Sequence, residues 1–276
     1  MSNEYFPMGG KYLRRFEDYV RQKCRSTSAS TTQTVYSLLT RLTPGLIASS
    51  FEEGNGLVLV CQNGETIAFP SPMPLIKYSH VAYGYEEILK RKYTLPQYIE
   101  VERDDIVVDC GGFVGGFSLS ASKLAKHVHL FEPDKMNARA ARANLSQYSN
   151  VTINEFGLYN DDTELTFNIS ESAVEHSVLE PDDGAVLFTR RIQVKRLSTY
   201  FEEVGCEPDF VKIEAEGVEI EVFDGLENLR PKKIAIDVSP ERVGQSPAEE
   251  LQTRLDAKGY SWRRRHNVLF ARREDS

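Results

Sequence analysis

Short apolar runs alternate with helical patterns through the C-terminal two thirds of the chain. The apolar runs begin at Ile106, Val128, Val151, Phe210 and Ile234. The stretches with apolar residues at helical spacing cover residues 117–125, 134–147, 216–229 and 248–257. Runs without alternating polar positions are typical of parallel strands that helices cover on both faces. The alternation therefore predicts an α/β domain with a doubly wound, mostly parallel sheet.

Two further pairs of segments predict hairpins within this domain. Residues 164–169 and 190–195 alternate apolar and polar side chains, which favours an antiparallel pair between the third and fourth strands. Trp262 and the apolar run 268–271 predict a final hairpin that closes the sheet.

The first 80 residues have a different pattern, typical of a small helical and hairpin extension. Asn63-Gly64 separates two apolar runs within residues 57–69, and Asn-Gly is the strongest short signal for a hairpin. After a polar linker or helix cap at 26–34, a helical stripe follows, formed by Val35, Leu38, Leu39 and Leu42. Residues 84–94 predict another short helix. We therefore expect an N-terminal extension over 1–100 and the α/β domain over 101–276.

Composition and charge narrow the function classes. Hydrophobic residues make up 41% of the 276 residues and charged residues 27%, which is typical of a globular protein. The net charge of −8 argues against general nucleic-acid binding. The four cysteines lack the spacing of a zinc or redox site, so we name no metal-ligating residues, although Asp237 could bind an acceptor or a metal. No apolar run approaches the roughly 20 residues of a membrane helix, and no signal peptide is evident. We expect a cytoplasmic protein.

Residues 11–25 are locally basic, with a net charge of +4. The pattern fits either a solvated helix face or a surface that contacts an anionic partner. A homodimer formed through the N-terminal extension is a further arrangement that the sequence permits.

A glycine-rich turn after the first buried strand is the most informative stretch. The strand ends at Asp109, and Gly111 and Gly115 follow before the next helix. Glycines allow a sharp turn and a close approach of the backbone to a ligand. A carboxylate at the strand's end would oppose a pyrophosphate, whereas it suits a cofactor with an ammonium and a sulfonium. The turn therefore favours S-adenosylmethionine, with Asp109, Gly111 and Gly115 at its site.

A second acid supports a nucleoside-containing cofactor. Glu132 ends the next strand, 21 residues after Gly111, where a carboxylate can accept both ribose hydroxyls. Glu132 by itself does not separate NAD from S-adenosylmethionine. The remaining candidates for cofactor binding are Phe156 and Gly157 beside the adenine and Tyr85 and Glu86 near the methionine end.

Three blocks resemble the FkbM-type S-adenosylmethionine-dependent methyltransferases: VVDCGGFVGGFSL, LFEPD and DFVKIEAEGVEIEVFDGL. The resemblance covers residues 100–240 well and the final hairpin loosely. It implies a class I methyltransferase fold, a Rossmann-like seven-stranded sheet whose last strand is antiparallel. It also implies methyl transfer, usually to a hydroxyl of a small molecule or sugar.

The chain departs from the family pattern in three places. Phe113 stands where the glycine loop usually has Asn, and Glu214 stands where the family usually has Asp. Residues 238–240, Val-Ser-Pro, follow the fifth strand where the family tends to have a His-Pro pair.

The catalytic candidates gather at the carboxyl ends of the strands, where open α/β sheets bind ligands. Methyl transfer to a hydroxyl needs positioning and a base for the proton. The candidates are Glu214, Glu216, Lys212, His176 and Asp237. Lys212 pairing with Glu214 or Glu132 is an equally good interpretation. Glu219 and Glu221 are expected on the helix surface, and His127 and His129 in buried structural roles.

Three functions remain open from the sequence. The first is an S-adenosylmethionine-dependent O-methyltransferase that acts on a small molecule or glycan. The second is a catalytically inactive regulatory or interaction module that retains the cofactor. The third is an NAD-dependent oxidoreductase, against which Asp109 argues.

Overall fold

The computed structural model describes residues 29–170, 186–242 and 244–273, and it divides the chain into two compact units. The first unit is Met1–Lys92 and the second is Tyr93–Ser276. The basic segment 11–25 and His176 lie outside the described residues.

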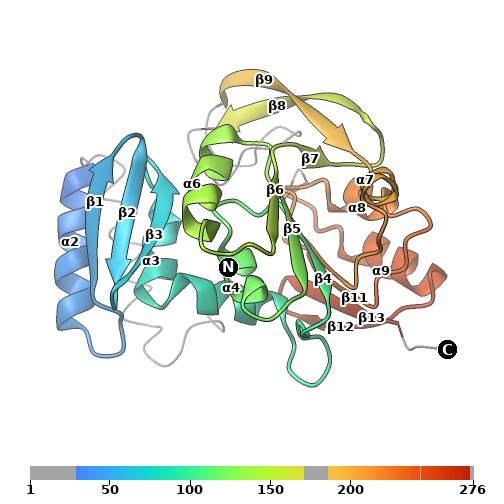
Figure 1. The fold of residues 1–276 in the computed structure, drawn as a ribbon, viewed down its shortest axis with the longest axis horizontal. Helices are drawn as coiled ribbons and strands as arrows, with labels where there is room; N and C mark the ends of the chain where they lie inside the picture. Colours follow the sequence, from blue (N-terminus) through green and yellow to red (C-terminus); the bar gives the residue numbers. More distant parts are fainter. Residues whose placement is uncertain (1–28, 171–185, 243, 274–276) are drawn as a thin grey trace. The chain divides into compact units, whose positions relative to one another are not determined.

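The first unit is built around a three-stranded antiparallel sheet (Figure 1). Its strands are β1 (Ser49–Gly54), β2 (Leu57–Gln62) and β3 (Glu65–Pro70), and its helices are α2 (Ala29–Leu42), α3 (Leu75–Ala82) and α4 (Tyr85–Tyr93). The hairpin predicted at Asn63-Gly64 is confirmed, with positive φ angles of 51° and 85°. Asn55-Gly56, with φ of 54° and 71°, makes the turn between β1 and β2 in the same way, and the same signal predicts it.

The helix predicted from the stripe at residues 35–42 is confirmed as the C-terminal part of α2, but the stripe is not its buried face. Leu38 and Leu42 are 59% and 71% exposed, and the helix already begins at Ala29, so residues 29–34 are not a linker. The buried face consists of Thr32, Gln33, Tyr36 and Thr40. Polar side chains can be buried there because they find partners: the Thr40 hydroxyl accepts a hydrogen bond from the backbone N–H of Ser49 at 3.0 Å.

The second unit has a seven-stranded sheet in the order β12-β13-β11-β10-β4-β5-β6. The parallel strands are β4 (Ile106–Cys110), β5 (His127–Phe131), β6 (Val151–Asn154), β10 (Phe210–Ile213) and β11 (Lys233–Asp237). The hairpin of β12 (Ser261–Arg265) and β13 (Val268–Arg272) closes the sheet, and β13 runs antiparallel to β11. The predicted class I methyltransferase architecture, with its antiparallel last strand, is confirmed.

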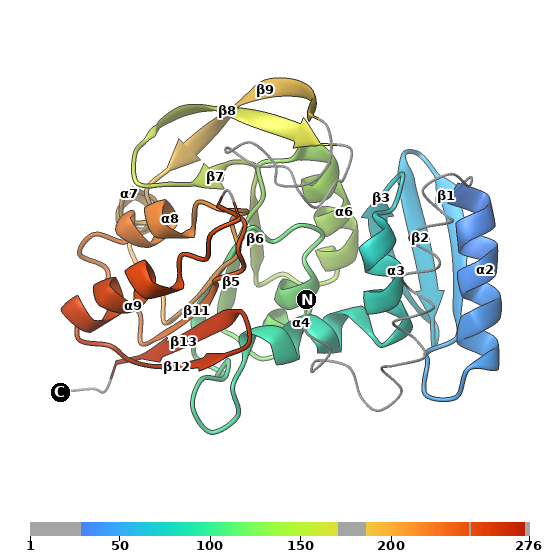
Figure 2. The same ribbon diagram turned by 180° about the vertical axis from the view of Figure 1, so that it is seen from behind.

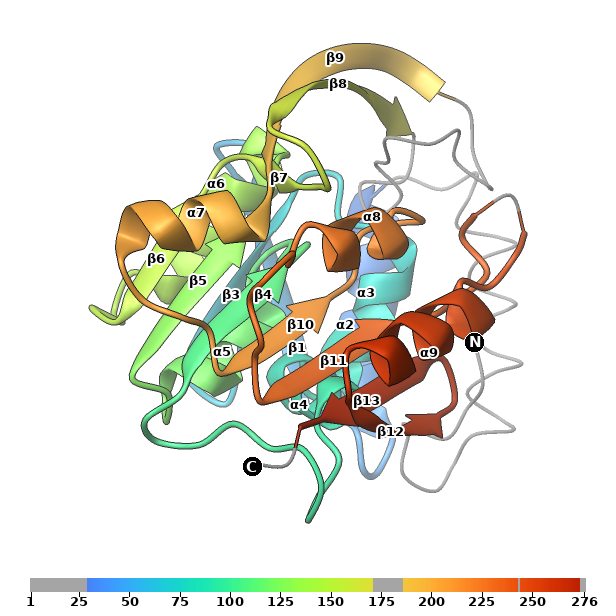
Figure 3. The same ribbon diagram turned by 90° about the vertical axis from the view of Figure 1, so that its right-hand side faces the viewer.

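Helices cover both faces of this sheet (Figures 2 and 3). The helices are α5 (Gly116–Ser122), α6 (Lys135–Leu145), α7 (Leu197–Val204), α8 (Glu219–Asp224) and α9 (Ala248–Ala257). Successive residues of β5 point to opposite faces. Accordingly, Phe131 packs in a cluster with residues of α7, α8 and α9, and Leu130 packs with residues of α5 and α6.

A small second sheet follows β6. Its order is β7-β9-β8, from β7 (Gly157–Leu158), β8 (Thr163–Ser170) and β9 (Val186–Lys195), and β8 and β9 form the predicted antiparallel hairpin. Helix α7 was not predicted, although Leu197, Tyr200 and Phe201 lie at helical spacing and are buried.

The sheet order reverses between β4 and β10, and we call the edge of the sheet at the carboxyl ends of these strands the crevice. Successive strands add on one side from β4 to β6 and on the other from β10 onward. In open α/β sheets, ligands bind outside the carboxyl ends of the strands at such a point. The loops after β4, β5, β10 and β11 meet at this edge, and they carry most of the candidate residues.

Candidate functional site

The glycine loop is held close to the loop that follows β10. Gly111 has φ of 67°, and a Cβ there would lie 1.7 Å from the carbonyl oxygen of Glu214. A Cβ on Gly112 would meet the Leu130 side chain at 2.4 Å, and one on Gly115, with φ of 83°, would meet Leu145 at 2.8 Å. The glycines are therefore required by close packing and by left-handed backbone conformations.

Phe113 also adopts a left-handed conformation, with φ of 50°. Asparagine tolerates this conformation better than other side chains with a Cβ. The Asn that the family usually has here thus suits the backbone, and Phe113 occupies the same turn at some cost in strain. Its N–H donates a hydrogen bond to Oε2 of Glu132 at 2.9 Å, which ties the glycine loop to the end of β5.

Asp109 and Lys212 form a buried ion pair across β4 and β10. The Lys212 Nζ lies 3.0 Å from Oδ1 of Asp109 and 3.4 Å from Oε2 of Glu214. The ammonium also donates to the carbonyl oxygens of Cys110 and Gly111, at 3.0 and 2.8 Å. Burial alone would lower the pKa of Lys212, but the charges of Asp109 and Glu214 outweigh it and raise that pKa.

The sequence left open whether Lys212 pairs with Glu214 or with Glu132. Its partners are Asp109 and Glu214, whereas Glu132 accepts from other groups. Asp109 is fully buried, and its Oδ2 accepts a hydrogen bond from the Ser118 hydroxyl at 2.7 Å. Asp109 therefore braces the strand end and α5, and its contact with a cofactor stays a prediction.

Glu132 lies where the sequence predicts a ribose-binding acid. Its Oε1 accepts from the backbone N–H of Asp134 at 2.8 Å, and its Oε2 from that of Phe113. The side chain is buried, and burial raises its pKa to about 8, although its hydrogen bonds act in the opposite direction. Oε1 also accepts from the Asn137 side-chain amide at 3.5 Å, so Oε2, which has one backbone donor, keeps a lone pair for a hydroxyl.

A group of acids and one tyrosine surrounds the carboxyl ends of β10 and β11. Glu214 keeps 25% of its side chain exposed, and Asp237 is buried with Oδ1 accepting from the Ser239 N–H at 2.7 Å. Tyr93 is fully buried beside them, and its ring lies under the Lys212 ammonium, 5.1 Å from it. Burial and the negative charges of Glu214 and Asp237 raise the pKa of Tyr93. Nothing in the sequence pattern around Tyr93 indicated this position.

Glu219 is a functional candidate that the sequence analysis placed wrongly. It is 1% exposed rather than on the helix surface, and its Oε1 accepts from the N–H groups of Ala215 and Gly217 at 2.8 and 3.1 Å. Its Oε2 is buried without a hydrogen bond in the described part of the chain. Burial, reinforced by the charge of Asp237, raises its pKa to about 7. A buried carboxyl with such a pKa is typical of functional sites.

Glu219 was predicted on the helix surface because α8 was expected to begin earlier than it does. The prediction began this helix at 216, but Glu216 and Gly217 have φ of 49° and 98°, so the helix begins at Glu219. A glutamate in the first turn can reach back to the preceding backbone N–H groups. Glu221 is not a free surface charge either, because both its carboxylate oxygens contact Arg242, at 2.6 and 2.8 Å.

The other predicted residues lie in several places. Glu216 is half-buried in the loop between β10 and α8. The Phe156 ring packs edge-on against Phe131 at 5.5 Å, and Gly157 begins β7. Tyr85 and Glu86 begin α4 in the first unit, so their part in cofactor binding stays a prediction.

The histidines of β5 have the structural roles expected from the sequence. His129 is buried and its Nδ1 lies 2.8 Å from the Tyr200 hydroxyl. Burial lowers its pKa to about 4, so the ring is neutral. His127 contacts the Thr152 hydroxyl at 2.9 Å.

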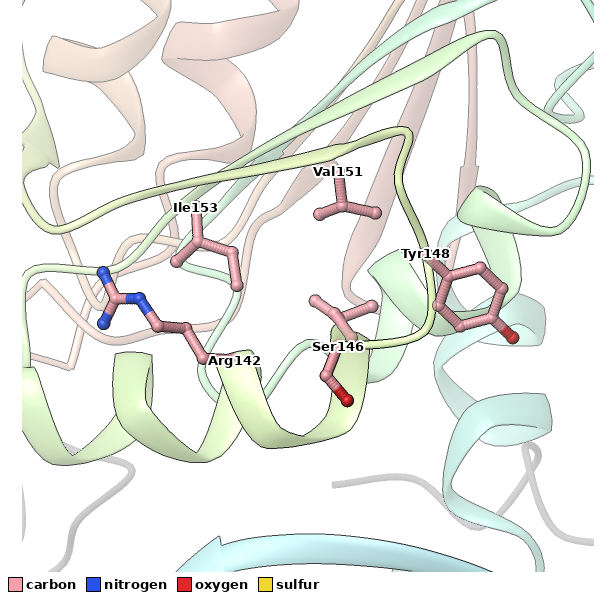
Figure 4. Close-up of a pocket in the computed structure, with 6 residues that line it drawn as sticks. Arg142, Ser146, Tyr148, Val151 and Ile153 are labelled. Carbon is pink, nitrogen blue, oxygen red and sulfur yellow. The ribbon is translucent and has the colours of Figure 1, made fainter.

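A separate hollow lies between the end of α6 and β6 (Figure 4). Its lining residues are Arg142, Leu145, Ser146, Tyr148, Val151 and Ile153. β6 is the edge strand of the seven-stranded sheet, two strands from β4, so the hollow lies away from the switch between β4 and β10. It is therefore distinct from the crevice at the switch point.

The crevice residues fit S-adenosylmethionine. Glu132 offers acceptors for ribose hydroxyls, and the acids after β10 and β11 give the edge a negative potential that suits a cationic sulfonium. In the described ranges, no group of three or more His, Cys, Asp or Glu side chains is arranged to hold a metal ion. No helix in the described part of the chain is long and apolar enough to span a membrane.

Comparisons with known proteins identify the family of the chain. Residues 109–261 match the model of the methyltransferase FkbM domain. No curated protein matches. A precorrin-6y C5,15-methyltransferase from Geobacter metallireducens is similar at 15% identity and a TM-score of 0.40, over 67% of this chain and 85% of that one.

Two further solved structures are similar. TYW2 of M. jannaschii, in complex with AdoMet, has 14% identity and a TM-score of 0.40, over 80% of this chain and 85% of that one. A putative methyltransferase from Streptococcus mutans, in complex with SAH, has 14% identity and a TM-score of 0.39, over 62% of this chain and 90% of that one. The matched domain covers more than half of the chain, which belongs to the FkbM methyltransferase family and is an S-adenosylmethionine-dependent methyltransferase.

Proposed function

We propose that the enzyme methylates a hydroxyl oxygen of a small molecule or glycan. The observation that carries this proposal is the set of carboxyl groups at the crevice edge, Glu214, Glu219 and Asp237. A neutral hydroxyl must lose its proton as it becomes methylated, and a carboxyl whose pKa lies near neutrality is suited to accept it. Glu219 has such a pKa, about 7, but it is buried, so the partly exposed Glu214 is the member of the set that can reach an acceptor.

S-adenosylmethionine supplies the methyl group as an electrophilic carbon on sulfur. In our proposal, Glu132 holds the ribose, and the glycine loop from Gly111 to Gly115 forms the wall beside it. Glu214 is the partly exposed acid that reaches the acceptor hydroxyl and takes its proton. Lys212, 3.4 Å from Glu214, holds that carboxylate in place. Asp237 and Glu216 line the acceptor side, and His176 remains a candidate base.

Incubation of the enzyme with ¹³C-methyl-labelled S-adenosylmethionine and a panel of hydroxylated small molecules and oligosaccharides tests the proposal. The expected product carries the label as a methyl ether, which NMR separates from a methyl amine or ester. Labelled amines or esters alone would contradict the proposal.

The alternative is a catalytically inactive module that binds S-adenosylmethionine. Phe113, Glu214 and the absent His-Pro pair favour it. Saturable cofactor binding without methyl transfer to any acceptor in an extract would support this alternative.

We also propose a cytoplasmic location and a homodimer formed through the N-terminal extension. Three cysteines in the described residues, Cys61, Cys110 and Cys206, are free thiols, which suits a reducing compartment. Light scattering of the full chain and of a chain that lacks residues 1–28 tests the dimer. Equal masses at the monomer value would contradict it.

A further inference from the structure

The final hairpin is strongly basic within an acidic protein. Residues 261–273 contain no aspartate or glutamate, and their arginines are Arg263, Arg264, Arg265, Arg272 and Arg273. The whole chain has a net charge of −8. β12 is the edge strand of the seven-stranded sheet (Figure 2). Arg263 and Arg264 on this strand are exposed.

Three of these arginines share one face of the hairpin. Arg263 and Arg265 alternate with Arg264 along β12, and Arg272 pairs with Ser261 on the strand beside them. We call Arg263, Arg265 and Arg272 the arginine face. Arg264 points to the opposite face, where its Nε donates to the His266 carbonyl oxygen at 2.8 Å.

Aromatic rings fix the positions of these guanidinium groups. The Cζ atoms of Arg263 and Arg272 lie 4.2 and 4.8 Å from the centroid of the Tyr98 ring, so the two atoms are within 9.0 Å of each other. The Tyr98 hydroxyl donates to the Ser261 carbonyl oxygen at 2.8 Å, which anchors the ring. Arg265 lies 5.1 Å from the Phe270 ring.

Protection of a sheet edge explains only part of this arrangement. Charged side chains on an edge strand prevent pairing with another sheet, but that role needs no fixed geometry. Two guanidinium groups stacked on one anchored tyrosine are preorganised, so less side-chain entropy is lost when they bind a ligand.

We propose that the arginine face binds a compact anion with two neighbouring phosphate groups, a diphosphate. Planar guanidinium groups bind phosphate oxygens through paired hydrogen bonds, and two phosphates of one diphosphate can engage both Arg263 and Arg272. A compact ligand fits better than a long polyanion because the chain outside the hairpin has a net negative charge, which disfavours a polymer that extends beyond the hairpin.

The register of the strands relates this face to the crevice. Arg263 pairs with Phe270, which pairs with Ala235, and Arg272 pairs with Lys233, so the two arginines lie two and four residues along the sheet from Asp237, roughly 12–14 Å away. This link rests on the proposed function: an acceptor with a hydroxyl at the crevice would carry its diphosphate on the arginine face.

Titration calorimetry with inorganic pyrophosphate tests the arginine face without any turnover. The wild type should bind it at low millimolar concentration or better, and Arg263→Gln should weaken binding at least fivefold. The matched control is Arg264→Gln, which removes the same charge from the same strand on the opposite face. It should bind as the wild type does.

Three outcomes would overturn the proposal. They are no binding of pyrophosphate by the wild type, equal weakening in both variants, and tighter binding of a single-stranded oligonucleotide or of anionic phosphatidylserine vesicles than of pyrophosphate. Binding of S-adenosylhomocysteine by Arg263→Gln verifies that the variant is folded. Methyl transfer to an acceptor without phosphates would refute only the link to the crevice, and failure of all methyl transfer would refute only the proposed function.

Discussion

The Lys212 ammonium lies 3.0 Å from the Asp109 carboxylate, across the two strands at which the sheet order reverses. Both side chains are almost completely buried, and Lys212 reaches on to Glu214 at the crevice edge. The pair therefore joins the end of β4, the glycine loop and the loop after β10 into one structure.

Replacing one partner of this pair should destabilise the protein strongly. Lys212→Met leaves the Asp109 charge buried without a counter-charge, which costs about 3–5 kcal/mol of unfolding free energy. Urea unfolding of the variant measures this loss. In the double variant Asp109→Asn/Lys212→Met, the loss should be smaller than the sum of the two single losses. Additive losses would show that the two groups do not depend on each other.

Gly111→Ala should be more harmful than an alanine at another left-handed glycine. Gly205, with φ of 75°, ends α7, and a Cβ added there would have no neighbouring atom within 4 Å. Gly205→Ala therefore costs only the backbone strain, roughly 1–2 kcal/mol. At Gly111 the new Cβ also collides with the Glu214 carbonyl oxygen. We expect an additional loss of at least about 2 kcal/mol in chemical unfolding. Equal losses in the two variants would mean that the glycine loop and the loop after β10 move apart to accommodate the new Cβ at little cost.

The stability of the protein should fall as Glu219 ionises. Its pKa is raised from 4.5 to about 7 in the folded state, mainly by burial. The neutral side chain therefore contributes stability that is fully present below pH 4.5 and is lost as the pH rises through about 7. The contribution is about 3 kcal/mol. Glu219→Gln should remove this part of the pH dependence of the unfolding free energy.

Glu221→Gln is the matched control for this experiment. It removes a carboxyl group from the same helix, and that carboxyl group pairs with Arg242. If Glu219→Gln retains the wild-type slope between pH 4.5 and 7, Glu219 is not the group that titrates.

Nucleoside binding should strengthen with increasing pH. Burial raises the pKa of Glu132 to about 8, and ribose hydroxyls donate to its ionised form. Affinity should rise about tenfold per pH unit below 8 and level off above it. The suitable probe is 5′-methylthioadenosine, which has the ribose but no amino group that titrates in this range. Glu132→Gln should bind it weakly and with a flat pH profile, and a flat wild-type profile would exclude Glu132 as the partner.

The sequence predicted the parallel strands and both hairpins of the second unit because buried strands and alternating segments leave clear patterns. It missed what depends on contacts between distant residues. Lys212 looks equally suited to Glu214 or Glu132 until the register places it beside Asp109. Glu219 has the spacing of a surface residue, and only the left-handed turn at Glu216 and Gly217 directs it inward.

Helix α2 illustrates the same limit in the first unit. Leu38 and Leu42 form the more apolar stripe, yet Thr40 is buried because its hydroxyl accepts from Ser49 and donates to the Tyr36 carbonyl oxygen. Hydropathy alone does not register such hydrogen bonds.

Calorimetric titration of S-adenosylmethionine into the wild type and Glu132→Ala tests the site most directly. We expect saturable binding to one site per chain, weakened by about 1–3 kcal/mol in the variant because the ribose hydroxyls lose their acceptor. Equal affinity in the two proteins, or no binding by a folded wild type, would contradict the placement of the cofactor at the carboxyl ends of β4 and β5.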